Sequence, residues 1–291
     1  MRVGILFHPR IDSAVRHARD VCGRLAAGGV DTWRASSWGV VEDPSQIEGS
    51  DLIVSFGGDG TFLRATRSAA PYGVPCIGVN YGRIGFLTDL RPEELDDRLA
   101  ELIQGDFWIE ERVLIEWSHV LSNGEVTTGV AAGDVVVGRG RIARAVEIDV
   151  AVSGLHLTTY TADGVIIATP TGSTGYTQAA GGPILHPECS DLVITPISPF
   201  LTPSNSVVVN RGMTIELVAH TTHEATLSID GQTDRAIESG DTVVCRICEH
   251  HVRHARLQPH DYFYSSVAEK LRWQVPRKLS RPHQPRPDRA S

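Results

Sequence analysis

The sequence predicts an α/β domain built on a parallel sheet, followed by a β-rich domain whose strands are mostly antiparallel. Up to about residue 106, short apolar runs alternate with segments in which apolar residues recur at helical spacing. This alternation is typical of a parallel sheet covered by helices. From residue 107, short β-rich segments dominate instead. A chain of 291 residues is also long enough for about two domains.

The N-terminal domain begins with an apolar segment at residues 2–8, which is typical of a buried parallel strand. Between residues 12 and 28, apolar side chains at helical spacing predict a helix, and the glycine pair at its end predicts its stop. The next expected elements are a strand in VDTWRA, a strand in DLIVSF, a helix from about residue 61, a strand at 75–80 and a helix at 91–106.

The second half of the chain is expected to form hairpins. Asn123-Gly124 and Asp230-Gly231 are pairs that favour the tight turns of β-hairpins. The expected strands are 112–121, 126–138, 145–153, 155–169, 207–219, 225–230 and 242–257. A final helix at 261–273 is expected to return to the N-terminal domain.

Domain limits follow from these elements. Residues 1–106, together with about 260–274, are assigned to the α/β domain. Residues 107–259 are assigned to the β-rich domain. The remaining residues, 275–291, are rich in proline and arginine and poor in apolar side chains, so we expect a disordered tail.

Bulk composition narrows the class of function. The formal net charge of −8 argues against a protein that coats nucleic acid or an anionic membrane by charge alone. No apolar run is as long as a membrane-spanning helix needs, about 18 residues, and the N-terminus is better explained as a strand than as a signal peptide. The five cysteines are odd in number and scattered, so we expect no disulfide framework and a cytoplasmic location.

Cys245 and Cys248 form a CxxC pair near three histidines, which is compatible with a zinc site. The alternative is that both lie in a β-strand, TVVCRICEHHVRHARL, where residues three apart point to opposite faces. Because no second CxxC is present, we favour the strand and assign no metal ligands.

The sequence GGDGTFLRA (57–65) directly follows the apolar run DLIVSF. A turn at the carboxyl end of a parallel strand is where α/β folds bind ligands. Its glycines let backbone N–H groups approach a phosphate, and the N-terminus of the next helix favours negative charge. Asp59 would serve such a site by accepting a hydroxyl proton or by positioning a divalent cation. The structural alternative is that Asp59 or Thr61 only caps the helix.

Two further stretches favour the functional explanation. DGVIIATPTGSTGYTQAAGGP (163–183) joins a buried-looking strand to a loop of hydroxyl residues and glycines, followed by Tyr176. Hydroxyls can bond phosphate and sugar oxygens, and an aromatic ring can stack on a base, although an elaborate turn would use the same residues. VNYGRIGFLTDL (79–90) ends a strand at Asn80 and places two glycines before Phe86.

With these motifs in this order, the chain resembles the bacterial inorganic polyphosphate/ATP-NAD kinases. The resemblance covers about residues 2–273 and rests on GGDGTFLRA, NYGRIGFLTDL, DGVIIATPTGSTGY, AAGGPILHP and SIDGQ. It implies phosphoryl transfer from ATP or polyphosphate to the 2′-hydroxyl of the adenosine ribose of NAD, giving NADP, with Mg²⁺ or another divalent cation. It further implies that NAD lies between the domains and that the chain forms a homodimer or homotetramer.

The resemblance also implies site residues. Asp59 matches the family's catalytic acid. Arg144, in RIARAVE, falls where the family often carries a basic residue near the ligand, although a solvated strand charge explains it nearly as well. The other positions expected to contact the dinucleotide or the donor are Gly57, Gly58, Gly60, Thr61, Arg64, Asn80, Phe86, Gly133, Asp134, Thr161, Asp163, Thr171, Thr174, Gly175, Tyr176, Thr177, Ala179 and Gln232.

The chain departs from the family pattern at several positions. Gly133, in AAGDVVVGRG, stands where an asparagine is expected, so we expect weaker NAD binding, a water in place of the amide, or an altered acceptor. Gly175 replaces the usual alanine, and Phe200 stands where a histidine is common. Thr161 is neither the arginine nor the glycine often found there. The choice of donor, ATP or polyphosphate, stays open.

Two other functions are compatible with parts of the sequence. A lipid kinase would share the GGDGT turn, but the chain is acidic, has no amphipathic basic helix, and carries a TPTGSTGY loop that a lipid kinase does not need. A non-catalytic dinucleotide sensor would explain Gly133, whereas the retained Asp59 argues against it. Turnover separates these functions, because a sensor binds NAD without consuming ATP.

Overall fold

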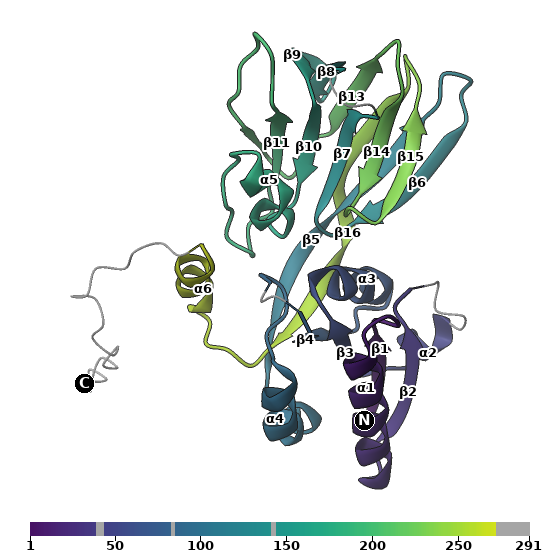
Figure 1. Cartoon of the computed structure of the whole chain (residues 1–291), viewed down its shortest axis with the longest axis vertical. Coiled ribbons are helices and arrows are strands. Elements are labelled where there is room, and N and C mark those ends of the chain that lie inside the picture. Colours follow the sequence, from purple (N-terminus) through teal and green to yellow (C-terminus); the bar gives the residue numbers. More distant parts are fainter. Residues whose placement is uncertain (39–43, 83–84, 141–143, 272–291) are drawn as a thin grey trace, which may run out of the picture.

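Figure 1 shows the computed structural model of the chain, with an α/β domain in the lower part of the view and a β-rich domain above it. The structure describes residues 1–38, 44–82, 85–140 and 144–271. The predicted tail at 275–291 and the end of the predicted last helix lie outside the described residues. Within the described ranges, no helix is both long and apolar enough to cross a membrane.

The α/β domain confirms the predicted order of elements. Its parallel strands are ordered β2-β1-β3-β4. Their bounds are Arg2–Phe7 for β1, Asp31–Ser36 for β2, Leu52–Gly57 for β3 and Cys76–Asn80 for β4. The helices are α1 (Asp12–Ala27), α2 (Pro44–Glu48), α3 (Asp59–Ala69) and α4 (Pro92–Gln104). α3 begins two residues before the predicted start, so Asp59 belongs to the helix itself.

The parallel sheet continues into the β-rich domain. β16 (Thr242–Arg256) pairs in parallel with β4, and β5 (Trp108–Val120) pairs antiparallel with β16. The sheet then passes from β16 through β13, β8 and β9, while β6 pairs with β5. We keep 107–259 as the proposed limits of the β-rich domain, because β5 begins and β16 ends just inside them.

A second sheet, antiparallel throughout, is ordered β12-β11-β10-β7-β14-β15. Apolar side chains from both sheets, such as Ile115 of β5 and Val165 of β10, form one buried core. In the first sheet the bounds are Val126–Ala131 for β6, Val146–Val152 for β8, Leu155–Ala162 for β9 and Ile215–His220 for β13. In the second they are Asp134–Arg139 for β7, Gly164–Ala168 for β10, Leu192–Ile197 for β11, Val207–Val209 for β12, Ala225–Ile229 for β14 and Thr233–Ile237 for β15.

Three segments predicted as single strands are each divided between the two sheets. The predicted strand 126–138 becomes β6 in the first sheet and β7 in the second, with the change at Ala132-Gly133. The predicted strand 155–169 becomes β9 and β10, with the change at Asp163. Continuous β-propensity does not reveal such a change of partner. The predicted segment 207–219 is divided as well, into β12 and β13.

Two strands were not predicted. β11 contains Pro196, which makes a run look unlike an internal strand. β15 is a mostly exposed edge strand without apolar alternation. The hairpins predicted from Asn123-Gly124 and Asp230-Gly231 are confirmed, since they join β5 to β6 and β14 to β15.

The final helix, α6 (Tyr262–Lys270), returns to the junction of the two domains. Tyr262, Phe263 and Val267 form a buried cluster that packs against Phe86 of the α/β domain and Trp108 of β5. α6 therefore stabilises the 86–90 loop from one side, which matters for the site described below.

The CxxC pair lies in β16, as favoured from the sequence. Cys245 belongs to the core between the sheets, whereas Cys248 packs in a different cluster with Leu114. Burial raises the pKa of Cys245 to about 12, so its thiol is protonated at neutral pH. In the part of the chain that the structure describes, no group of three or more His, Cys, Asp or Glu side chains could hold a metal ion.

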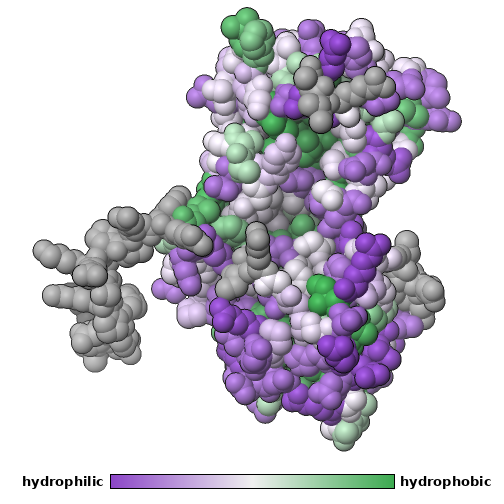
Figure 2. All heavy atoms as spheres, in the orientation of Figure 1, coloured by the Kyte–Doolittle hydropathy of each residue, from purple (hydrophilic) through white to green (hydrophobic). Residues whose placement is uncertain are grey.

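The two domains differ in surface character. On the face seen in Figure 2, hydrophilic residues predominate on the α/β domain, and more of the hydrophobic surface lies on the β-rich domain. Several large apolar side chains of the β-rich domain are exposed, with Leu201 at 91% and Leu155 at 76% of their full area. The others in this group are Leu157, Phe200, Val208 and Met213.

Candidate functional site

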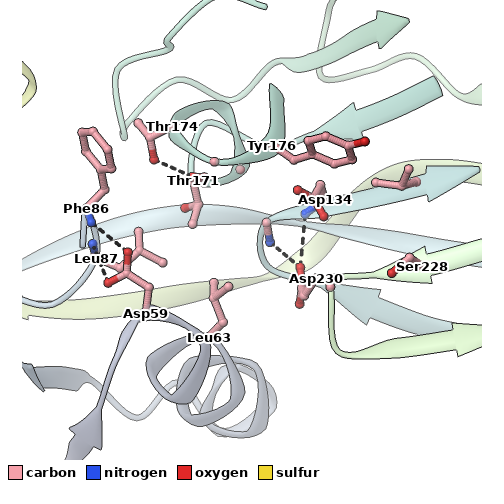
Figure 3. Close-up of a pocket in the computed structure, with 15 residues that line it drawn as sticks. Asp59, Leu63, Phe86, Leu87, Asp134, Thr171, Thr174, Tyr176, Ser228 and Asp230 are labelled. Atoms are coloured by element: carbon pink, nitrogen blue, oxygen red, sulfur yellow. Dashed lines mark hydrogen bonds between the residues drawn. The ribbon is translucent and has the colours of Figure 1, made fainter. Parts of the chain in front are cut away.

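A cavity of about 400 Å³ opens between the two domains. Figure 3 shows that its lining comes from the N-terminal turn of α3, the 86–87 loop, the segment at Gly133 where the chain passes from β6 to β7, the loop after β10 and the β14–β15 turn. Five segments that are distant in sequence therefore meet around one space. The lining residues are Asp59, Leu63, Phe86, Leu87, Gly133, Asp134, Val136, Thr171, Gly172, Thr174, Gly175, Tyr176, Ser228, Asp230 and Gly231.

Asp59 is the first residue of α3, where the chain leaves β3 through an extended Gly58. Its carboxylate accepts backbone N–H bonds from Phe86 (2.8 Å), Leu87 (3.3 Å) and Thr88 (3.4 Å), and the Thr88 hydroxyl lies at 3.3 Å. Figure 3 shows two of these bonds crossing to the loop. The carboxylate is therefore fixed at a helix N-terminus, which favours its negative charge, at the edge of the cavity.

Gly85 makes this approach of the loop to Asp59 possible. A Cβ at Gly85 would lie 2.1 Å from both carboxylate oxygens. We expect Gly85→Ala to displace the Asp59 carboxylate and to reduce turnover about 100-fold, because a misplacement of about 1 Å can have that effect. NADP-formation kinetics would measure it. The matched control is Gly82→Ala in the same loop, where the nearest atom to the new Cβ is 3.8 Å away; equal losses in both variants would contradict the explanation.

Asp230 organises the opposite wall. Asp230 and Gly231 both have positive φ (53° and 60°), as the tight turn between β14 and β15 requires. The Asp230 carboxylate accepts backbone N–H bonds from Ala132 (3.1 Å), Gly133 (2.7 Å) and Asp134 (3.1 Å). Arg67 of α3 pairs with it at 2.8 Å. This buried carboxylate therefore links α3 of the α/β domain to the segment 132–134 of the β-rich domain.

Asp134 is a buried carboxyl in the cavity wall, close to Asp230. Burial raises the pKa of Asp134 to about 7, and the neighbouring negative charge of Asp230 adds to the effect. At neutral pH the Asp134 carboxyl is therefore divided between a form that donates a hydrogen bond and a form that only accepts.

The loop after β10 is held against Gly133 by close backbone contact. A Cβ at Gly172 would lie 2.2 Å from the Gly133 carbonyl oxygen, so only glycine fits there. Gly133 also accepts the Thr169 backbone N–H (2.9 Å). The Thr174 hydroxyl donates to the Thr171 carbonyl (3.1 Å), and Tyr176 is 48% exposed at the cavity. Short helix α5 (Tyr176–Ala179) follows.

The structure brings part of the sequence-predicted set together at the cavity and leaves the rest outside its lining. The predicted residues that line it are Asp59, Phe86, Gly133, Asp134, Thr171, Thr174, Gly175 and Tyr176. The predicted residues outside the lining are Gly57, Gly58, Gly60, Thr61, Arg64, Asn80, Arg144, Thr161, Asp163, Thr177, Ala179 and Gln232.

Several of the residues outside the lining have evident structural contacts. Gly57 is packed against Thr61, and Gln232 donates to the Gly60 carbonyl (2.9 Å). Thr177 is fully buried. Asp163 pairs with Arg139 at 3.1 Å, at the far end of β10 from the cavity.

Thr161, Asn80 and Arg144 also lie outside the cavity lining. The Thr161 carbonyl accepts the Phe200 N–H (2.8 Å). The Asn80 side chain accepts the Gly82 N–H (2.8 Å), and Arg144 is exposed.

Sequence reasoning missed Asp230 as a site residue. Asp230 lies in the SIDGQ motif, but we interpreted its Asp-Gly pair as a hairpin turn and assigned only Gln232 of that motif to the site. It also missed Lys270 of α6, whose ammonium lies 5.1 Å from the Phe86 ring centroid. Burial lowers the pKa of Lys270, even though the charges of Asp59 and Asp89 oppose that shift. No local pattern predicts that a C-terminal lysine comes near Asp59.

A buried ionic network lies behind the cavity wall. Arg256 is fully buried and donates to Glu110 (2.8 and 3.2 Å), to Asp89 and to the Leu87 carbonyl (3.3 Å). Because the Leu87 N–H donates to Asp59, Arg256 supports the 86–90 loop from the side opposite the cavity. Burial alone would raise the pKa of Glu110, but His254, Arg112 and Arg256 outweigh it and hold the pKa well below its usual range.

The same network reaches the other cavity loop and α6. Arg112 donates to Glu110 (2.7 Å) and to the Thr171 hydroxyl (3.1 Å). The Tyr262 hydroxyl donates to Glu110 (2.8 Å). Burial lowers the pKa of His254 to about 3, so its ring is neutral beside the two arginines. The buried network therefore contacts the loop at Leu87, the loop at Thr171 and helix α6.

Comparisons with known proteins agree with these motifs. The model of the ATP-NAD kinase N-terminal domain matches residues 12–107, and that of the ATP-NAD kinase C-terminal domain matches residues 132–257. An NAD kinase of Dehalococcoides mccartyi strain CBDB1 is 38% identical over 272 residues, 93% of this chain and 96% of that protein. An NAD kinase of Chloroflexus aggregans is 35% identical over 274 residues, 93% and 98% respectively.

Solved structures show the same fold. An Archaeoglobus fulgidus NAD kinase in complex with ATP superposes with a TM-score of 0.76 at 25% identity, covering 94% of this chain and 99% of that one. A yeast NADH kinase complexed with NADH gives 0.85 at 20% identity, covering 97% and 90%. At that identity the second likeness shows the fold alone.

Proposed function

The chain belongs to the ATP-NAD kinase family, and we propose that it phosphorylates NAD to NADP in the cavity between its domains. The observation that carries this proposal is the Asp59 carboxylate, fixed at the N-terminus of α3 by the backbone of Phe86 and Leu87 in the wall of the cavity. The acceptor would be the 2′-hydroxyl of the adenosine ribose of NAD.

Asp59 would orient the acceptor hydroxyl and accept its proton as the phosphoryl group arrives. Its bonds to the backbone of Phe86 and Leu87 fix the direction of the carboxylate before substrate binds. Phosphoryl transfer depends mainly on positioning and electrostatic stabilisation, so a fixed acid at a helix N-terminus suits it.

The other cavity residues would bind the substrates. The glycine turn at 57–58 and the N-terminus of α3 favour the phosphates of the donor. Hydroxyl groups of Thr171 and Thr174 and the exposed ring of Tyr176 suit the sugar and base of NAD.

A divalent cation such as Mg²⁺ fits this site as a shared ligand of protein and substrate. The described residues form no cage of three or more ligands, and Mg²⁺ is commonly held by one or two carboxylates together with substrate phosphates. Asp59 would be the protein's contribution. When bound, the cation would neutralise charge on the donor phosphates.

The donor would be ATP or inorganic polyphosphate. An assay of NADP formation with purified protein, NAD, Mg²⁺ and each donor in turn tests the function. Turnover with either donor would support it and name the donor. NAD binding without turnover would favour a dinucleotide sensor, and phosphorylation of a lipid instead of NAD would favour a lipid kinase.

Gly133 is expected to weaken NAD binding relative to relatives that carry asparagine. A Cβ there would lie 3.3 Å from an Asp230 carboxylate oxygen, with other neighbours at 3.8 Å and beyond, so a small shift would admit a side chain. We expect Gly133→Asn to tighten NAD binding up to about tenfold, the gain of one hydrogen bond. An NAD titration by calorimetry measures it; unchanged affinity would show that the missing amide does not weaken binding.

We further propose a homodimer or homotetramer in the cytoplasm, with NAD and ATP as partners and no nucleic acid or membrane. The exposed apolar side chains of the β-rich domain, Leu155 and Leu201 among them, support association of copies through that domain. Sedimentation velocity would give the oligomeric state; a monomer at working concentration would contradict it.

A further inference from the structure

A second group of residues lies beside the glycine turn, at the carboxyl ends of β1 and β2. It consists of His8, Arg10, Trp38 and Arg64, and we call it the Trp38 cluster. The His8 N–H donates to the Phe56 carbonyl (2.9 Å), one residue before Gly57, and the Ser37 N–H donates to the Phe7 carbonyl (2.9 Å). Three strand ends are therefore level, and the cluster adjoins the turn that would receive the donor.

The Trp38 ring contacts the other three side chains of the cluster. The Arg10 guanidinium lies 4.2 Å from the Trp38 ring centroid and the Arg64 guanidinium 5.6 Å. The His8 ring meets Trp38 edge-on at 5.1 Å. Cation–π contacts of this kind hold guanidinium groups in place without neutralising them.

The cluster has no anionic partner among the described residues. Arg67, one turn along α3 from Arg64, pairs with Asp230 at 2.8 Å, but no described carboxylate lies at ion-pair distance from Arg10, Arg64 or His8. Burial lowers the pKa of His8, and the charges of Arg64 and Arg10 lower it further. Burial and then Arg67 lower the pKa of Arg64. The charged forms of His8 and Arg64 are thus disfavoured by burial and by neighbouring positive charges, and a bound anion would favour them.

The position relative to Asp59 fits a donor. Arg64 lies five residues after Asp59 on α3, about 7.5 Å along the helix axis at 1.5 Å per residue. None of the four cluster residues is among those that line the cavity, although Asp59 and Leu63 of the same helix are. Donor and acceptor could then approach the α3 N-terminus from different sides.

Resting on the proposed function, we propose that His8, Arg10 and Arg64, arranged around Trp38, bind the polyphosphate chain of the phosphoryl donor beyond the group transferred. The ligand chemistry is a run of phosphates, which ATP and inorganic polyphosphate share. Arginine suits it because the guanidinium donates two parallel hydrogen bonds to phosphate oxygens.

The test measures binding and turnover separately in the full-length protein. Calorimetry with a non-hydrolysable ATP analogue and with tripolyphosphate would compare wild type with Arg10→Gln/Arg64→Gln. We expect about tenfold weaker binding per arginine, and about 100-fold for the pair. Affinity for NAD should stay within about twofold. Trp38→Leu should weaken donor binding about tenfold, because the guanidinium groups lose their support.

The salt dependence of donor binding and a matched control variant test whether the arginine charges are responsible. Donor affinity of the wild type should fall as salt rises, and that of the double variant should fall less. Arg19→Gln, an exposed arginine of α1, should leave donor binding unchanged. Weaker binding of either probe in the double variant supports the proposal and shows which donor the cluster serves. Unchanged binding of both probes, or no binding to wild type, overturns it. Absence of NADP formation alone would instead overturn the proposed function.

Discussion

Replacing Asp59 by asparagine is expected to reduce turnover by about two orders of magnitude or more, the range lost with a general base. Asparagine keeps the size of the side chain but offers one acceptor oxygen and one amide. The amide would face a backbone N–H, either of Phe86 or of the Leu87–Thr88 pair, so a small loss of stability should accompany the loss of activity. NADP-formation kinetics and NAD calorimetry measure turnover and binding independently, and NAD binding should persist.

Thr88→Val is the control for this variant. It removes the hydroxyl that lies 3.3 Å from the Asp59 carboxylate but leaves the acid and the backbone bonds in place. Its turnover should fall only a few-fold, about the effect of one weak hydrogen bond. Near-wild-type turnover of Asp59→Asn would remove Asp59 from its proposed role.

Replacing Arg256 by methionine is expected to lower the free energy of unfolding by about 3–5 kcal/mol, the cost of breaking a buried ion pair from one side. Asp89 would lose its buried partner, and Glu110 would keep Arg112 and the Tyr262 hydroxyl but lose one of its two arginines. The Leu87 carbonyl would lose its donor as well, so turnover should fall together with stability. Urea unfolding followed by circular dichroism gives the change in midpoint at constant slope.

Arg246→Met on the same strand is the matched control. Arg246 pairs with Glu116 at 2.7 Å, close to the Arg256–Glu110 distance of 2.8 Å, but its side chain is 61% exposed where that of Arg256 is 0%. Solvent screens the exposed pair, so its urea midpoint should hardly move. Similar midpoints for the two variants would show that the buried network does not stabilise the junction.

The sequence by itself determined the order of the main elements of the α/β domain and the chemistry of the glycine turn. Apolar spacing in 12–28 and continuous apolar runs such as DLIVSF report burial along a single element, which is a local property. For the same reason GGDGT could be placed between a strand and a helix, although the helix begins at Asp59 and not at about residue 61 as predicted. The resemblance of the motifs to one kinase family then named the reaction.

Only the tertiary structure decided which distant segments meet. β16 pairs with β4, and Asp230 contacts Gly133, where the chain passes from one sheet to the other. These contacts join residues that are far apart in sequence. Arg256 and Glu110 are charged residues in strands, where exposure would be expected, yet both are buried on the paired strands β16 and β5 at the domain junction. The sequence shows that a side chain is charged, but its partner and its burial depend on contacts with distant segments. The same contacts position Asp59, because Arg256 binds the Leu87 carbonyl and the Leu87 N–H donates to Asp59.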